Sequence, residues 1–153
     1  MTKVTIWSDG AARGNPDGPG GYGTVIQFVD AKGTLHEKEL SCGYEVTSNN
    51  RMELMGAIAG LEALTRPCEV DLYSDSSYLV KAFEENWIGS WQKNGWMTSG
   101  KKPVKNQDLW LRLLKAMEPH AVRFHWVKGH NGNPLNERCD KLATAAADKM
   151  KTV

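Results

Sequence analysis

Two short segments of the sequence end in an aspartate and share a local pattern. Residues 6–9 (IWSD) and 72–75 (LYSD) each place the acid two residues after an aromatic side chain, on the same face of a predicted strand. If the two strands are parallel neighbours, both carboxylates emerge together at the carboxyl ends of the strands, where open α/β sheets bind ligands. A single aspartate at such a point is more often a turn or cap residue. The repeated pattern therefore favours a shared site at Asp9 and Asp75.

Two further acids lie in predicted helices. Glu53 lies near the start of a helix that carries Gly56 and Gly60 on the same face, and each glycine costs up to about 1 kcal/mol of helix propensity relative to alanine. Close packing of that face on the sheet would explain both glycines and bring Glu53 towards the strand ends. The alternative is that this acid only interacts favourably with the positive end of the helix dipole. Asp140 lies at the edge of the apolar stripe of the last helix. Glu137 is the alternative candidate for the site on this helix, but it has the helical spacing for an ion pair with a lysine one turn later.

Four carboxylates in one pocket would raise each other's pKa and would need a positive counter-charge to stay ionised. An all-oxygen set of ligands suits Mg²⁺, with Mn²⁺ as a substitute. Two such ions roughly 4 Å apart would support in-line cleavage of a phosphodiester, whereas a pair of carboxylates alone would also suit glycoside hydrolysis. Residues 86–128 carry +6 and the rest of the chain −5, within a net charge of +1. Although most charge runs are solvated faces, this basic stretch favours a phosphate substrate.

The predicted elements place these acids in an α/β fold. Three early strands followed by helix–strand units are typical of a mixed sheet flanked by helices, here three antiparallel strands and then two parallel ones. A glycine- and proline-rich loop is predicted over residues 10–23. The predicted strands are residues 4–9, 22–29, 35–44, 69–75 and 121–128, and the predicted helices run from 48 or 49 to 64, from 76 to about 91, from 107 to 117 and from a cap and first-turn proline at 133–134.

The bulk composition indicates one globular domain over residues 1–153. Hydrophobic residues make up 41% of the chain and charged residues 24%, as in ordinary soluble proteins. No apolar run reaches the length of a membrane span, and no signal peptide is predicted. Three cysteines, an odd number, at Cys42, Cys68 and Cys139 favour reduced thiols over a disulfide framework or a zinc site. We therefore expect a cytoplasmic monomer without a membrane partner.

Taken in order, the motifs resemble those of bacterial type-1 ribonucleases H, and the likeness runs from Val4 to about Ala147. The resemblance implies a ribonuclease H-like fold with a basic protrusion over about residues 87–105. It also implies an endonuclease that hydrolyses the RNA strand of RNA–DNA hybrids, leaving 5′-phosphate and 3′-hydroxyl ends. The matching segments are residues 9–10 (DG), 14–16 (GNP), 18–23 (GPGGYG), 49–54 (NNRMEL), 74–76 (SDS), 126–130 (WVKGH) and 136–140 (NERCD).

The resemblance assigns a catalytic role to five side chains. The metal-binding carboxylates fall on Asp9, Glu53, Asp75 and Asp140, with Asp9 as the ligand shared by two Mg²⁺ ions. An auxiliary histidine falls on His130, in a loop flanked by glycine. Its implied role is to assist proton movement or product departure, and no covalent bond to the substrate is implied.

The resemblance also implies substrate contacts. Asn15, Asn49 and Asn50 match residues that contact the minor groove, where 2′-hydroxyls distinguish RNA from DNA, although asparagine is also a common turn and cap residue. Trp87 and Trp91 are expected to anchor the protrusion by packing. The lysines expected to contact phosphates of the DNA strand, here called the protrusion lysines, are Lys93, Lys101, Lys102 and Lys105.

Departures from the family pattern, among them Gln92 and Asn94 in the protrusion, are expected to change affinity and fine cleavage preference and to leave the chemistry unchanged. Asp17 lengthens its loop by one residue, and Ala12 and Ser77 stand where relatives often have cysteine and glutamine. Two other functions share part of this pattern. A DNA-processing nuclease of the same fold, such as an integrase or junction resolvase, would not need the asparagines or the Lys-Gly-His loop. A non-catalytic hybrid-binding module would gain nothing from four carboxylates that repel phosphates.

Overall fold

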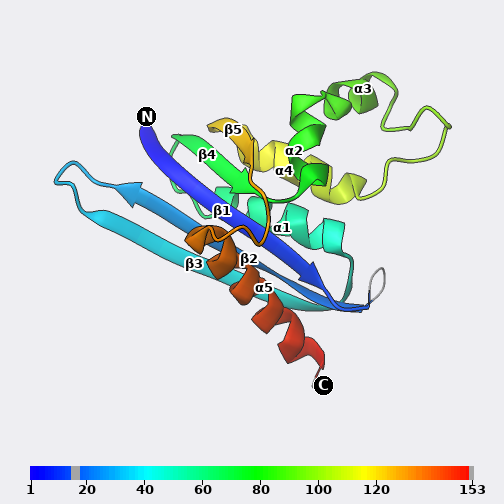
Figure 1. The fold of residues 1–153 in the computed structure, drawn as a ribbon. Coiled ribbons are helices and arrows are strands. Elements are labelled where there is room, and N and C mark those ends of the chain that lie inside the picture. Colours follow the sequence, from blue (N-terminus) through cyan, green and yellow to red (C-terminus); the bar gives the residue numbers. More distant parts are fainter. Residues whose placement is uncertain (15–17, 152–153) are drawn as a thin grey trace.

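The computed structural model describes residues 1–14 and 18–151, which form a five-stranded mixed sheet with helices on both faces (Figure 1). The strand order is β3-β2-β1-β4-β5. The first three strands pair antiparallel, and the last two join the other side of β1 in parallel. The predicted α/β fold is therefore confirmed. The strands are β1 (Thr2–Ala12), β2 (Gly18–Val29), β3 (Leu35–Thr47), β4 (Cys68–Ser74) and β5 (Ala121–Trp126).

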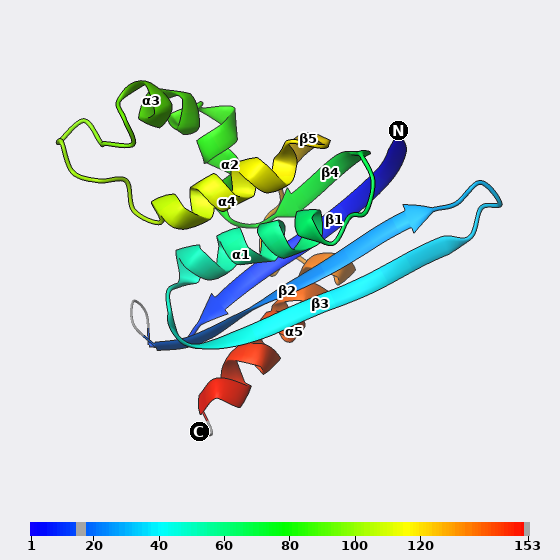
Figure 2. The ribbon, with the colours of Figure 1, turned by 180° about the vertical axis from the view of Figure 1, so that it is seen from behind.

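The helices form a layer on each face of the sheet. One face is covered by α1 (Asn49–Glu62), which packs against α4 (Gln107–Met117), and by α2 (Ser77–Glu84) (Figure 2). The opposite face of β1, β2 and β3 is crossed by α5 (Pro134–Lys151) (Figure 1). The short helix α3 (Trp87–Lys93) lies away from the sheet, beyond α2 (Figures 1 and 2). Among the described helices, none combines the length and the apolar character needed to cross a bilayer.

The predicted loop over residues 10–23 is wrong over much of its length, because β1 continues to Ala12 and β2 begins at Gly18. Glycines in this stretch lie in the strands and allow helices to pack closely against the sheet. A Cβ atom on Gly10 would lie 2.5 Å from the backbone nitrogen of Glu53 in α1, and a Cβ on Gly21 would lie 2.7 Å from the Cβ of Ala146 in α5. Composition alone does not separate glycines of a turn from glycines that let a helix approach a strand.

The single helix predicted from residue 76 to about 91 is also wrong, because the structure divides it into α2 and α3. The break lies at Asn86, whose backbone has a φ of 53° in the left-handed region that asparagine tolerates better than most residues. Its side-chain oxygen accepts a hydrogen bond from the backbone N–H of Gly89 at 3.2 Å. Asn86 therefore ends one helix and caps the next, which turns the chain into the protrusion.

The hydrophobic core has a large part on the α1 side of the sheet and a small part under α5. The large part contains Leu54, Ile58 and Leu61 of α1, all of them fully buried. The small part is built on Trp7, Val25 and Cys139. The predicted start of α5 is confirmed, since the side-chain oxygen of Asn133 accepts hydrogen bonds from the N–H groups of residues 135 and 136 at 3.0 and 3.1 Å.

Candidate active site

Asp9 and Asp75 lie side by side where the parallel pairing of β1 and β4 ends, as the shared sequence pattern predicts, although β1 itself continues past Asp9 to Ala12. The register of β1 and β4 pairs Trp7 with Tyr73 and Ser8 with Ser74. The two aromatic rings stack with centroids 4.4 Å apart, on the face from which both carboxylates project one pleat later. The strand pairing therefore fixes the distance between these two acids independently of any ligand.

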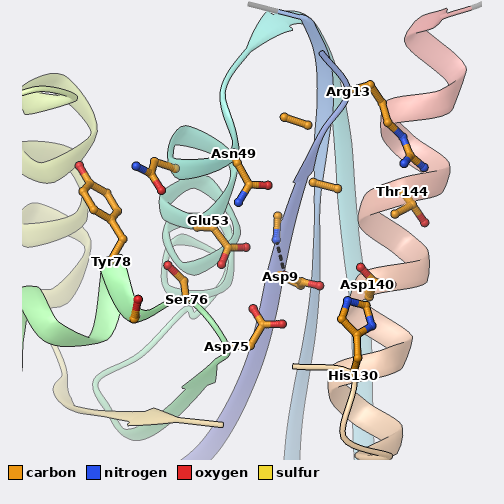
Figure 3. Close-up of a pocket in the computed structure, with 15 residues that line it drawn as sticks. Asp9, Arg13, Asn49, Glu53, Asp75, Ser76, Tyr78, His130, Asp140 and Thr144 are labelled. Atoms are coloured by element: carbon orange, nitrogen blue, oxygen red, sulfur yellow. Dashed lines mark hydrogen bonds between the residues drawn. The ribbon is translucent and has the colours of Figure 1, made fainter. Parts of the chain in front are cut away.

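Glu53 joins the two aspartates from α1 (Figure 3). The two α1 glycines allow the helix to lie close to β1: a Cβ on Gly60 would be 2.8 Å from the side chain of Ile6, and one on Gly56 would be 3.3 Å from the carbonyl oxygen of Asp9. The predicted close approach of this helix face is therefore confirmed. Carboxylate oxygens of Asp9, Glu53 and Asp75 all lie within 4.8 Å of one another, a grouping that could hold a metal ion.

Within the described residues, no ion pair compensates the charge of this group. Burial raises the pKa of Asp9, and the neighbouring carboxylates of Glu53 and Asp75 raise it further. Burial and the neighbouring Asp75 carboxylate likewise raise the pKa of Glu53. Glu53 is 4% exposed, and its Oε1 atom has no hydrogen-bond partner in the described part of the chain. A buried, unsatisfied carboxylate oxygen beside two other carboxylates fits a hard divalent cation, which binds oxygen ligands. The site residues thus fit the metal ion that the sequence implies.

Asp140 faces this group from α5, across a pocket of about 650 Å³ that all four acids line (Figure 3). It does not belong to the set of three whose oxygens meet within 4.8 Å. The rival acid Glu137 is exposed and does not line the pocket. The structure therefore brings together three of the predicted carboxylates tightly and the fourth at the opposite wall.

His130 lines the same pocket and lies beside Asp140 in Figure 3. It is exposed, and its backbone φ of 53° places it at a sharp turn of the loop between β5 and α5. The other histidines have contacts elsewhere: His36 with Asp30, His120 with the N–H of residue 68, and His125 with Asp71.

Two residues that the sequence analysis did not single out hold this loop against Asp75. The indole N–H of Trp126 donates a hydrogen bond to the backbone oxygen of Asp75 at 3.2 Å. A Cβ on Gly129 would lie 2.6 Å from the Oδ2 atom of Asp75, so a side chain at this position would displace the Asp75 carboxylate or the loop. The glycine next to the loop histidine was the available signal, although sequence alone does not say what it packs against.

Two of the three asparagines that are expected to contact the substrate lie at the carboxylate pocket. Asn49 and Asn50 are exposed at the start of α1 and line the pocket. The helix cap is Ser48, whose hydroxyl accepts a hydrogen bond from the N–H of Arg51 at 3.2 Å, so capping does not account for Asn49. Asn15 and the Asp17 insertion lie outside the described residues.

The protrusion is anchored by packed tryptophans and carries exposed cations. The ring of Trp91 lies 6.2, 5.9 and 5.4 Å from the rings of Trp87, Trp96 and Trp110, and all four pack in or against the core. The expected packing role of Trp87 and Trp91 is therefore confirmed. The four protrusion lysines are exposed, and none of them lines the carboxylate pocket.

Comparisons with known proteins agree with this geometry. The family model described as RNase H matches residues 1–148. A ribonuclease H of Lachnoclostridium phytofermentans is 64% identical over 95% of this chain and 92% of its own length, and one of Thermus thermophilus is 57% identical over 97% and 86%. LC9-RNase H1, a type 1 RNase H with the type 2 active-site motif, superposes with a TM-score of 0.88 at 30% identity over 98% of this chain and 74% of its own. LC11-RNase H1, solved in complex with an RNA/DNA hybrid, superposes with a TM-score of 0.68 at 26% identity, over 96% of this chain and 98% of its own.

Proposed function

The chain belongs to the ribonuclease H family, and from this premise we propose that its carboxylate pocket hydrolyses the RNA strand of RNA–DNA hybrids. The protein is accordingly an endoribonuclease. The assignment of the site rests on one observation: carboxylate oxygens of Asp9, Glu53 and Asp75 lie within 4.8 Å of one another. Asp140 and His130 line the same pocket on its opposite wall. The solved complex of LC11-RNase H1 with a hybrid supports the substrate.

The four carboxylates would hold two Mg²⁺ ions, for which Mn²⁺ could substitute, with Asp9 as the shared ligand. Bound Mg²⁺ supplies the positive charge that the buried acids lack and stabilises charge on the phosphate oxygens during cleavage. The orphaned Oε1 atom of Glu53 supports this proposal, because a carboxylate buried without a partner is otherwise costly.

The remaining residues would bind and orient the hybrid. Asn15, Asn49 and Asn50 would contact the minor groove. The protrusion lysines would contact DNA phosphates, which give affinity without sequence preference. His130 would take or pass on a proton as water attacks the phosphate and the 3′-oxygen leaves. Attack by water, and not by the 2′-hydroxyl, gives 5′-phosphate and 3′-hydroxyl ends.

We also propose that residues 1–153 act as a single monomeric domain in the cytoplasm. All three cysteines are unpaired, and two of them are buried. Burial raises the pKa of the Cys139 thiol to about 12, so this cysteine stays protonated and unreactive. These features support a reducing compartment.

The test is cleavage of end-labelled RNA–DNA hybrid, duplex RNA, duplex DNA and single strands, with Mg²⁺, Mn²⁺, Zn²⁺ or excess chelator. We expect cleavage of the RNA strand of the hybrid with Mg²⁺ or Mn²⁺, poor activity with Zn²⁺ and none with chelator. Preferential cutting of DNA would favour a DNA-processing nuclease, and binding without cutting would favour a non-catalytic module. Ends carrying a 2′,3′-cyclic phosphate would exclude attack by water.

Two variants on the same helix provide a matched comparison for the site. Asp140→Asn should lose most of the activity because it lines the pocket, whereas Glu137→Gln should retain it because it does not. Asp9→Asn and Asp75→Asn should lose nearly all activity and still bind hybrid. More than a few per cent of the wild-type rate in Asp9→Asn or Asp75→Asn would remove that residue from the proposed set, as would an Asp140→Asn variant as active as Glu137→Gln.

A further inference from the structure

Among the described residues that line the carboxylate pocket, Arg13 is the one that carries a permanent positive charge. It follows directly after β1 and lies at the rim on the α5 side, close to Thr144 and beyond Asp140 (Figure 3). Its charge does not neutralise the buried acids, because its hydrogen bonds go to Asp148 near the end of α5. The pocket therefore has a cation at its edge that the proposed chemistry leaves without a role.

The position of Arg13 is fixed, whereas its partner is exchangeable. Its backbone N–H donates to the carbonyl oxygen of Pro19 at 2.7 Å, which ties the end of β1 to the start of β2. The guanidinium donates from Nε to Asp148 Oδ1 at 3.1 Å and from Nη2 to Oδ2 at 3.4 Å. The two side chains are 39% and 53% exposed, and solvent-exposed ion pairs of this kind are among the weakest. A phosphate offers the same fork of oxygens with the same charge.

We propose that Arg13 is a substrate-binding residue that contacts a phosphodiester of the RNA strand beside the scissile one, and that Asp148 competes with this phosphate for the guanidinium. The proposal rests on the proposed function, since it takes the strand in the carboxylate pocket to be RNA. Arg13 lines that pocket while the protrusion lysines do not. The two sets of cations would therefore contact different strands.

The competing explanation is that the Arg13–Asp148 pair only tethers the end of β1 to α5. The two explanations make different predictions for the two partners. If the pair is only a tether, removing either residue has the same effect on every property. If Arg13 binds phosphate, removing Arg13 weakens binding, while removing Asp148 frees the guanidinium and strengthens it. Both variants lose the same small stability in either case.

The experiment compares Arg13→Ala, Asp148→Asn and the double variant, with urea unfolding as a measure of the tether. Lys141→Ala, an exposed cation on α5 outside the pocket, is the control for general loss of charge. We expect Arg13→Ala to raise KM by about 5- to 20-fold at nearly unchanged kcat, as for loss of one charge-assisted contact made equally in ground and transition states. Asp148→Asn should lower KM by about two- to fivefold, and the double variant should behave as Arg13→Ala. Equal changes of KM in the two single variants, or none, would overturn the proposal.

Two further measurements then locate the contact: the salt dependence of hybrid affinity, and the effect of replacing one charged phosphodiester of the hybrid by an uncharged methylphosphonate. Arg13→Ala should flatten the log–log dependence of hybrid affinity on salt by roughly one unit, and Lys141→Ala should not. Scanning a single methylphosphonate along the RNA strand should reveal one linkage that weakens the wild type but not Arg13→Ala. A linkage effect identical in both proteins would overturn the proposal, as would a position in the DNA strand. If the wild type fails to cleave hybrids at all, the proposed function fails instead, so the two failures are distinguishable.

Discussion

Asp9→Asn should stabilise the metal-free protein while it abolishes cleavage. Asp9 is 5% exposed and lies against two other carboxylates, and burial raises its pKa. The folded state therefore holds a proton that the unfolded chain has lost above about pH 4. Because the folded state binds more protons than the unfolded state, stability falls as the pH rises from about 4 towards the raised pKa. Asparagine has no charge to bury and keeps a side-chain oxygen for the N–H of Gly10, which Asp9 Oδ1 now accepts at 2.9 Å.

The size of the effect has an upper bound. An aspartate that stays protonated in the folded state up to pH 7 lowers stability by at most about 4 kcal/mol, since each pKa unit is worth about 1.4 kcal/mol. Water reaches the pocket, so we expect a gain of about 1–3 kcal/mol for the variant, with Tm rising by roughly 2–4 °C per kcal/mol. The gain should disappear near pH 4, where the aspartate is protonated in both states.

The assay is thermal and urea unfolding of both proteins in excess chelator at pH 4 and pH 7.5. Adding Mg²⁺ at about 100 times its dissociation constant should stabilise the wild type by about 2.7 kcal/mol and the variant by less. Asp30→Asn is a control with the opposite sign, since hydrogen bonds from His36 and from two backbone N–H groups lower the pKa of Asp30, so its loss should weaken the fold at neutral pH. A variant at Asp9 that is no more stable than the wild type at pH 7.5, or equally stabilised at both pH values, would refute the argument.

Three further variants test the remaining parts of the site. His130→Ala should slow turnover by about 10²-fold or less without abolishing it, as for loss of an auxiliary proton carrier, and single-turnover rates will show whether chemistry or product departure is affected. Replacing the four protrusion lysines by alanine should raise KM and flatten the salt dependence of binding while kcat stays nearly constant; unchanged slopes would make them ordinary surface charges. Gly129→Ala should displace the Asp75 carboxylate or the loop and so weaken Mn²⁺ binding, measured by calorimetry. The control is Gly33→Asn at an exposed turn, where nothing lies within 4 Å of the Cβ position. This control variant should bind Mn²⁺ as the wild type does.

The parts of the site that the sequence predicts are those fixed by short-range periodicity. Asp9 and Asp75 follow from strand alternation, and Glu53 follows from two glycines that no helix would carry without a close neighbour. The parts that it does not predict depend on contacts between distant segments. The separation of Asp140 from the other three oxygens is set by where α5 crosses the sheet, which no local pattern specifies.

Glycine and asparagine account for the errors in the predicted elements. Gly21 lies in a glycine-rich stretch that is typical of a turn, yet the structure places it in β2. Glycine is needed there because a Cβ atom would collide with the Cβ of Ala146 in α5. Asn86 is compatible with the interior of a helix, but in the structure its backbone is in the left-handed region. In both cases the residue type permits two local structures, and a contact made elsewhere in the fold decides between them.

The packing of α5 across β1, β2 and β3 has a consequence for how the enzyme matures during translation. Domains tend to fold from the amino end as the ribosome extends them. A nascent chain that ends before residue 134 already contains Asp9, Glu53 and Asp75, but it lacks Asp140, and the sheet face around Trp7 and Val25 has no cover. On the proposed assignment of Asp140, the nuclease would therefore become active only once its final helix has been made and docked, and chaperones that bind exposed apolar sheet would find their target during that interval.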